Sequence, residues 1–149
     1  MQDSTLITVI TRNEPEKIGR FLGSVAQNDS LNKIPILIVD DSQYHDRKPA
    51  ERNSSAITSG KTDGLDITHV TQKEWAVYKQ RILDIVGSGD LLDPLVLGTE
   101  SWNTPNVRNI CQVLTLAIFK RVSTILYFDD DIDVNGFNLP RDFQARGME

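Results

Sequence analysis

Residues 124–134 read TILYFDDDIDV, an apolar run that stops abruptly at a group of carboxylates. The apolar part, residues 125–128, is typical of a strand buried on both faces of a parallel sheet. The acidic residues that follow are Asp129, Asp130, Asp131 and Asp133. Four carboxylates this close repel one another unless a cation lies among them, and their hard oxygen atoms suit Mg²⁺, Mn²⁺ or Ca²⁺. The alternative is a solvated acidic turn after a strand.

The length and composition indicate one soluble domain. The chain has 149 residues, of which 39% are hydrophobic and 25% charged, enough for one buried core. A net charge of −5 argues against a nucleic-acid partner. Cys111, the single cysteine, excludes an internal disulfide and a multi-cysteine zinc site, so we expect it in the core. Without a signal-peptide pattern or an apolar run of membrane-spanning length, a cytoplasmic protein is expected.

The N-terminal third predicts a strand, a helix and a second strand. Residues 6–11 are rich in β-branched side chains, which favour a strand. Asn13 is the predicted N-cap of a helix with Pro15 in its first turn. Apolar residues then recur at helical spacing: Ile18, Phe21, Leu22 and Val25. Residues 34–39 predict the second strand, so the two strands should pair in parallel.

The middle of the chain is less regular. Residues 43–63 show little periodicity and predict a loop with at most a short helical turn. Residues 65–70 predict a third strand in which His69 makes a hydrogen bond and is not a metal ligand. Thr71 should cap a helix that runs to about Val86. Residues 87–105 form a long candidate binding loop, and a helix from Thr104 or Asn106 should lead to the fourth strand.

Polar residues follow the first, second and fourth predicted strands. They are Thr11-Arg12-Asn13, Asp40-Asp41-Ser42 and Asp129-Asp130-Asp131. Ligands of open α/β sheets bind at the carboxyl ends of the strands, where the strand order reverses. We therefore predict a three-layer α/β/α domain with a mainly parallel sheet in the order 3-2-1-4, which brings all three groups to one edge.

Three segments resemble the nucleotide-binding half of family 2 inverting glycosyltransferases, which have the GT-A fold, a Rossmann-like arrangement. ITVITRNEPEKIGRFLGSV resembles the opening strand and helix of that family, and IPILIVDDSQ resembles its second strand with an acidic end. NVRNICQVLTLAIFKRVSTILYFDDDI resembles the family's Arg-Asn helix and the strand with the D-x-D motif. The resemblance extends from Leu6 to Val134, apart from the middle loops.

The resemblance assigns expected roles around the nucleotide. Thr11 and Arg12 would lie beside it, and Asp40 or Asp41 would accept a hydrogen bond from the base. Arg108, at the Arg-Asn position, would face the nucleotide.

The acidic motif would bind the ribose and diphosphate part of the sugar donor. Asp129 and Asp130 would lie near the ribose and the diphosphate, and Asp131, with Asp129, would hold Mn²⁺ or Mg²⁺. The implied ligand is a nucleoside diphosphate sugar, with a UDP-sugar favoured, and the implied activity is a metal-dependent inverting glycosyltransferase or a fragment of one.

One departure from the family lies at the C-terminus. The family's catalytic base and acceptor-binding segment come well downstream, whereas this sequence ends at Glu149, 16 residues after Asp133 (149 − 133). Residues 1–149 are therefore expected to be a single nucleotide-sugar-binding domain whose base lies beyond residue 149. An acceptor-binding domain or another chain would be its partner.

Three alternatives remain from the sequence. The first is a non-catalytic nucleotide- or metal-binding domain with the same site. The second is a receiver-type signalling domain, which ILIVDDS at residues 36–42 resembles, although a complete strand and helix precede it here. The third is a haloacid-dehalogenase-type phosphatase with Asp131 as nucleophile and Asp133 as acid, but that family carries its motif near the N-terminus.

Overall fold

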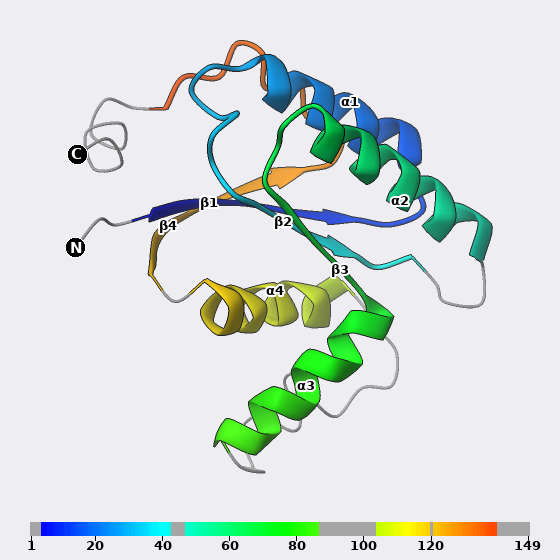
Figure 1. The fold of residues 1–149 in the computed structure, drawn as a ribbon, viewed down its shortest axis with the longest axis vertical. Helices are drawn as coiled ribbons and strands as arrows, with labels where there is room; N and C mark the ends of the chain where they lie inside the picture. Colours follow the sequence, from blue (N-terminus) through cyan, green and yellow to red (C-terminus); the bar gives the residue numbers. More distant parts are fainter. Residues whose placement is uncertain (1–3, 43–46, 87–103, 120, 140–149) are drawn as a thin grey trace.

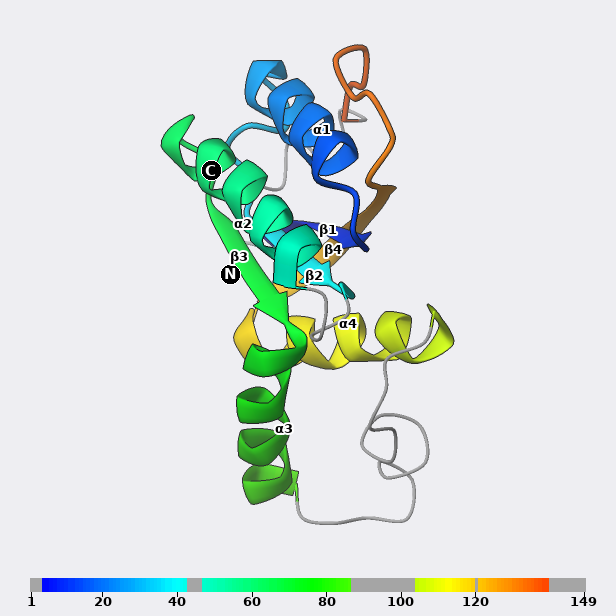
Figure 2. The same ribbon diagram turned by 90° about the vertical axis from the view of Figure 1, so that its right-hand side faces the viewer.

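The protein folds as a three-layer α/β/α domain. The structure, a computed structural model, describes residues 4–42, 47–86, 104–119 and 121–139. Its elements are β1 (Ser4–Thr11), α1 (Pro15–Gln27), β2 (Ile36–Asp40), α2 (Arg47–Thr62), β3 (Ile67–Thr71), α3 (Gln72–Val86), α4 (Thr104–Ile118) and β4 (Val122–Asp129). The strands form one parallel sheet in the order β3-β2-β1-β4. Helices α1 and α2 cover one face, and α3 and α4 lie on the other (Figures 1 and 2). The predicted Rossmann-like fold and strand order are confirmed.

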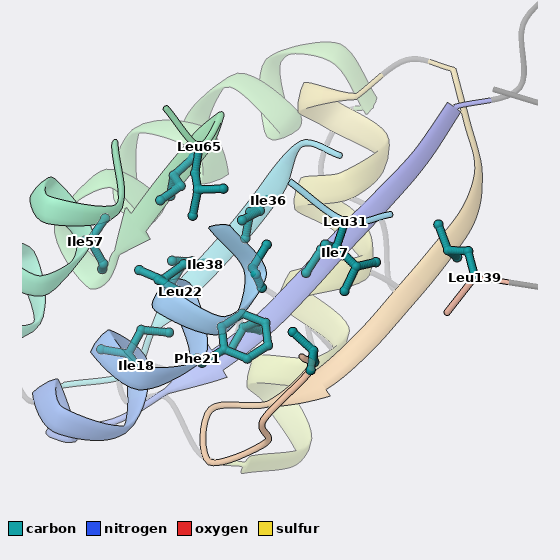
Figure 3. Close-up of a cluster of buried hydrophobic side chains, with 14 residues drawn as sticks. Ile7, Ile18, Phe21, Leu22, Leu31, Ile36, Ile38, Ile57, Leu65 and Leu139 are labelled. Atoms are coloured by element: carbon teal, nitrogen blue, oxygen red, sulfur yellow. The ribbon is translucent and has the colours of Figure 1, made fainter. Parts of the chain in front are cut away.

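Alternation along the strands divides the apolar side chains between two cores. The α1/α2 core contains Ile7, Val9, Ile18, Phe21, Leu22, Val25, Leu31, Ile36, Ile38, Ile57, Leu65, Ile67, Val134 and Leu139 (Figure 3). The α3/α4 core contains Leu6, Leu37, Val39, Val70, Trp75, Ile82, Val107, Ile110, Cys111 and Leu114. Cys111 is fully buried, as predicted. Because successive strand residues face opposite cores, these lists also show which way each polar residue at a strand end points.

The first helix begins one residue later than Asn13 would allow as its cap. Glu14 occupies the N-cap position, without a side-chain cap hydrogen bond, and Pro15 takes the first turn as predicted. Asn13 has a φ of 53°, in the left-handed region, and its N–H donates to Ser42 Oγ (3.0 Å). The prediction of Asn13 as N-cap was wrong, because its backbone turns toward β2 instead of into the helix.

Residues 43–63, predicted as a loop, contain the 16-residue helix α2, so that prediction was wrong. Helix α2 packs against α1 through small residues: a Cβ placed on Gly19 would lie 3.7 Å from Ala56 Cβ. A Cβ on Gly60 would lie 3.1 Å from Leu22 Cδ1. Close packing of this kind leaves few large apolar residues on the buried face, and the apolar periodicity that marks a helix is correspondingly weak.

Strand β4 is the edge strand of the described sheet and is only partly buried. Leu126 and Phe128 pack against the α1/α2 core, and the Phe128 ring lies 5.9 Å from Phe21 and 5.4 Å from Phe137, centroid to centroid. Tyr127, on the other face, is 49% exposed. The prediction of burial on both faces was wrong, because a run of apolar residues does not reveal whether its strand is central or at an edge.

The remaining boundaries agree with the sequence to within a few residues. Thr71 caps α3 as predicted: its Oγ1 accepts from the Lys73 N–H (3.2 Å), and Glu74 accepts from the Thr71 N–H (3.0 Å). Helix α4 begins at Thr104, one of the two predicted starts. The candidate binding loop lies almost wholly outside the described residues. Among the helices that are described, none has the length and apolar character needed to cross a membrane.

The chain after the acidic residues is fastened to the end of α1. Asn28, 5% exposed, donates through Nδ2 to the carbonyl oxygens of Val134 (2.6 Å) and Phe137 (2.8 Å). The Val134 N–H donates to Ser24 Oγ (3.2 Å), and the Val134 side chain enters the α1/α2 core. The acidic turn is therefore held at both ends, by β4 before it and by this anchor after it.

Replacement of Asn28 tests the anchor. We expect Asn28→Ala to lower the free energy of unfolding by about 2–4 kcal/mol, because two carbonyl groups lose their donor in a largely buried place. Urea denaturation measures the change. Asn138→Ala, an exposed change on the same segment, is the control and should stay within about 0.5 kcal/mol of the parent. Equal stability of the two variants would show that Asn28 does not hold the segment.

Candidate functional site

The polar ends of three strands meet at one edge of the sheet. Strand β1 lies between β2 and β4, with Thr11 opposite Asp40 and Ile10 opposite Asp129 in the register. The ladder continues one residue beyond the strands, since the Asp41 N–H donates to the Thr11 carbonyl oxygen (2.8 Å). The shared edge follows from the confirmed strand order and is where open α/β sheets bind ligands.

Asp40 and Asp41 are adjacent in sequence but belong to opposite faces of the sheet. Ile36 and Ile38 face the α1/α2 core, so Asp40 continues that row. Leu37 and Val39 face the α3/α4 core, and Asp41 continues the other row. The two carboxylates consequently have separate surroundings and can have separate roles.

Asp40 is a buried carboxylate whose two oxygens both have hydrogen-bond partners within the protein. Its Oδ1 accepts from the Ser42 N–H (3.1 Å), the Ser42 hydroxyl (2.5 Å) and Asn53 Nδ2 (3.1 Å). Its Oδ2 lies 3.1 Å from Nε2 of His69, which confirms the prediction of a hydrogen bond for that histidine. Burial favours the protonated acid, but the hydrogen bonds from His69 and Ser42 outweigh it and hold the pKa of Asp40 below its usual value.

Asp41, in contrast, has one carboxylate oxygen to which no described residue donates a hydrogen bond. It is 4% exposed, and its Oδ1 is buried without a hydrogen-bond donor among the described residues. Its Oδ2 lies 3.9 Å from Nε of Arg12, a weak ion pair with an arginine that is 48% exposed. Burial raises the pKa of Asp41, and neither Arg12 nor Gln72 fully offsets that effect. A buried carboxylate oxygen without a donor is rare in folded proteins and indicates a position for a ligand group that donates.

The first three aspartates of the acidic turn, which spans residues 129–133, differ in exposure. Asp130 is partly buried beside Thr11, whereas Asp129 and Asp131 are exposed. Burial raises the pKa of Asp130, and the Thr11 hydroxyl and the Lys17 ammonium act in the opposite direction without fully offsetting it. The Thr11 hydroxyl has no hydrogen bond of full geometry, so this contact with Asp130 is a loose one.

Helix α1 presents positive charge to the acidic turn. Lys17 Nζ lies 3.1 Å from Glu14 Oε1; this hydrogen bond, together with the more distant Asp130 and Asp131, raises the pKa of Lys17. One turn further along α1, Arg20 lines a shallow pocket together with Asp131 and Asp133. The negative charge of the turn is thus partly offset by Lys17 of α1.

The donor set at the turn suits a cation that arrives with phosphate. Among the described residues no three His, Cys, Asp or Glu side chains converge as a metal-ligand group. Asp129 and Asp131 nevertheless offer exposed, hard oxygen atoms. Mg²⁺ is typically bound by one or two carboxylates together with phosphate oxygens and water, and this arrangement fits that pattern in type.

Arg108 lies near the start of α4, is exposed, and follows the buried Val107. Figure 2 shows the N-terminal end of α4 on the same side of the molecule as the arrowheads of β1 and β4. The N-terminal part of α4, to which Arg108 belongs, therefore lies toward the carboxyl edge, although among the described residues Arg108 has no ion pair with the acidic turn. Its expected role toward a nucleotide stays a prediction.

Several residues that organise this edge were not predicted from the sequence. Ser42 was quoted with the acidic pair but given no role, and Asn53 lies in the segment taken for a loop. Lys17 carries no signal of its own in the sequence. A signal was available for Ser42, because a serine two residues after a strand-end aspartate often bonds back to that side chain.

Comparisons with known proteins add little to this geometry. A solved structure of S. aureus TarS has a TM-score of 0.43 and 16% sequence identity, and the alignment covers 86% of this chain and 16% of that chain. A structure of TarS 1-349 has a TM-score of 0.42 and 16% identity, with 86% and 27% covered. No family model matches the sequence, and no curated protein is significantly similar to it. The fold assignment therefore rests on the strand order of the chain itself.

The hydrogen bonds to the buried carboxylate of Asp40 predict that the stability of the fold depends on pH. Because folding lowers its pKa below the ordinary value of 3.8, the ionised carboxylate stabilises the fold above that pH. This contribution is lost as the pH falls through the folded pKa. We expect Asp40→Asn to be less stable than the parent by about 2–4 kcal/mol at pH 6, with the difference shrinking toward pH 2.

Chemical denaturation at several pH values measures this difference. Asp66→Asn, at an exposed position without a hydrogen bond to the edge, is the control and should follow the parent throughout. If Asp40→Asn and the parent lose stability in parallel between pH 6 and pH 2, Asp40 is not the buried anion described above.

Proposed function

We propose that this chain is the donor-binding domain of a glycosyltransferase, which binds a nucleoside diphosphate sugar through a divalent cation. The observation that carries the proposal is the buried Oδ1 of Asp41, an acceptor without a donor at the edge where β1, β2 and the acidic turn meet. A base such as uracil has an imide N–H that can donate to a carboxylate. The resemblance in sequence to family 2 glycosyltransferases supports the same class.

Asp41, and not Asp40, is the proposed partner of the base. Both oxygens of Asp40 are engaged by His69, Ser42 and Asn53, so a ligand would have to displace internal hydrogen bonds. Asp41 loses no internal hydrogen bond at Oδ1 when a ligand binds there. Arg12, beside Asp41 and half-exposed, would cover the nucleoside.

The phosphate end of the donor would lie toward the acidic turn. Asp129 and Asp131 would hold Mn²⁺ or Mg²⁺, and Thr11 and Asp130 would lie beside the ribose and the diphosphate. The bound cation would neutralise the charge that develops on a departing nucleoside diphosphate. Without it, the phosphates would face the carboxylates of the turn directly, and repulsion would oppose binding.

Arg108, at the start of α4, would supply a further positive charge to the diphosphate. No described residue is assigned as the catalytic base. Sugar transfer would accordingly depend on an acceptor-binding part beyond the described residues. A UDP-sugar is the favoured donor, because a carboxylate acceptor matches the imide of uracil.

Calorimetric titration with UDP, in the presence and absence of Mn²⁺, tests the proposal. We expect Mn²⁺ to strengthen UDP binding at least about tenfold, because each ligand supplies contacts to the other and linkage makes the effect reciprocal. Asp131→Asn should remove the enhancement. Asp133→Asn, an exposed change in the same turn, should retain it. Equal affinity with and without Mn²⁺ in the parent would remove the metal from the proposal.

In the same titrations, Asp41→Asn tests the contact with the base separately from the contacts with the phosphates. We expect UDP affinity to fall about tenfold while the enhancement by Mn²⁺ stays the same, since the change leaves the acidic turn intact. Unchanged affinity would contradict the role of Asp41. A domain that binds a nucleotide without transferring sugar would give the same binding results, and turnover of a UDP-sugar distinguishes the two.

A further inference from the structure

Two hydrogen bonds from the end of β2 hold the peptide groups on either side of Arg12. On the N-terminal side, the Thr11 carbonyl oxygen accepts from the Asp41 N–H (2.8 Å). On the C-terminal side, the Asn13 N–H donates to Ser42 Oγ (3.0 Å). The first is an ordinary ladder bond, whereas the second extends the ladder past the strand through a side chain. The backbone of Arg12 is therefore fixed by β2, its neighbour in the sheet (Figure 1).

The Ser42 hydroxyl is fully used in this arrangement. It donates to Asp40 Oδ1 (2.5 Å) and accepts from the Asn13 N–H (3.0 Å) and Asn53 Nδ2 (3.1 Å). A hydroxyl has one donor and two acceptor positions, so none is left over. Ser42 is 5% exposed, and water has little access to replace any of these bonds.

The network also excludes a nucleophilic role for this serine. Ser42 and His69 bond to different oxygens of Asp40, and the imidazole does not bond to the hydroxyl. The Ser42 proton is directed at a carboxylate held in its ionised form, which orients the oxygen lone pairs toward Asn13 and Asn53. The hydroxyl thus connects Asp40 to the turn after β1 through two hydrogen bonds.

We infer that Ser42 is a positioning residue for the nucleotide site: its hydroxyl links the buried Asp40 carboxylate to the Arg12–Asn13 turn and so fixes Arg12 beside Asp41. This inference rests on the proposed nucleotide binding. Asn13 has a φ of 53°, a conformation that costs free energy for a residue other than glycine. The bond to Ser42 selects that conformation, and without it the turn can relax and carry Arg12 away from Asp41.

The test is UDP affinity in the presence of Mn²⁺, measured on the full chain well below its melting temperature. We expect Ser42→Ala and the nearly isosteric Ser42→Cys to weaken UDP binding about tenfold, because Asn13 loses a strong acceptor. Ser42→Thr keeps the hydroxyl and should stay within about twofold of the parent. Ser42→Cys covers the case in which Ser42→Ala does not fold.

Leu65→Ala is the control matched for stability. Leu65 is buried in the α1/α2 core just before β3, at the opposite edge of the sheet, so the change destabilises the fold without touching the site. We expect it to leave UDP affinity unchanged. If it weakens binding as much as Ser42→Ala does, the effect of Ser42 is a general loss of stability and the inference is wrong.

Two further results would overturn the inference in distinguishable ways. Parental affinity in Ser42→Ala and Ser42→Cys would show that the hydroxyl only stabilises the fold, while the proposed function would stand. Absence of UDP binding by the parent, with or without Mn²⁺, would reject the proposed function itself and this inference with it.

Discussion

Strand β1 is hydrogen-bonded to β2 on one side and to β4 on the other, and the candidate site depends on that double pairing. The pairing brings Thr11, Asp41 and Asp129 to one edge although they are far apart in sequence. Each strand contributes something different there: β1 a turn with positive charge, β2 a buried carboxylate, and β4 the exposed acidic turn. Parallel strands pair in this order only with helices crossing between them, so the layers on both faces are part of the same constraint.

Alternation of side chains across the sheet gives the two aspartates after β2 separate roles. Asp40 lies on the face of α2, where Asn53 and His69 supply donors, and it becomes a structural anion. Asp41 lies on the other face, where the described residues supply a weak ion pair with Arg12 and a partial contribution from Gln72, and one of its oxygens is left for a ligand. The same sheet edge therefore carries a structural carboxylate, Asp40, next to a carboxylate that is available to a ligand, Asp41. Ser42 connects Asp40 to the turn that carries Arg12, the partner of Asp41.

The strand–helix alternation, the strand order and the shared edge could be predicted, because apolar periodicity and polar strand ends are local features of the sequence. Helix α2 could not, because its contact with α1 uses Gly19, Ala56 and Gly60, and such small residues give no periodic apolar signal. The different surroundings of Asp40 and Asp41 could not be predicted from the sequence either. Alternation predicts that they point apart, but the donors on each side come from α2, β3 and α3. The conformation of Asn13 likewise depends on Ser42, 29 residues away in sequence.

In the proposed function, a divalent cation and a nucleotide share the edge between β1, β2 and β4. Paramagnetic broadening of backbone amide signals by substoichiometric Mn²⁺ in the presence of UDP, with Mg²⁺ as the diamagnetic reference, locates the cation directly. We expect the strongest broadening at Asp129, Asp130 and Asp131, weaker broadening at Thr11 and Arg12, and the least at Ser4 and Asp66, at the opposite end of the strands. Broadening centred elsewhere, or spread evenly over the exposed carboxylates, would contradict it.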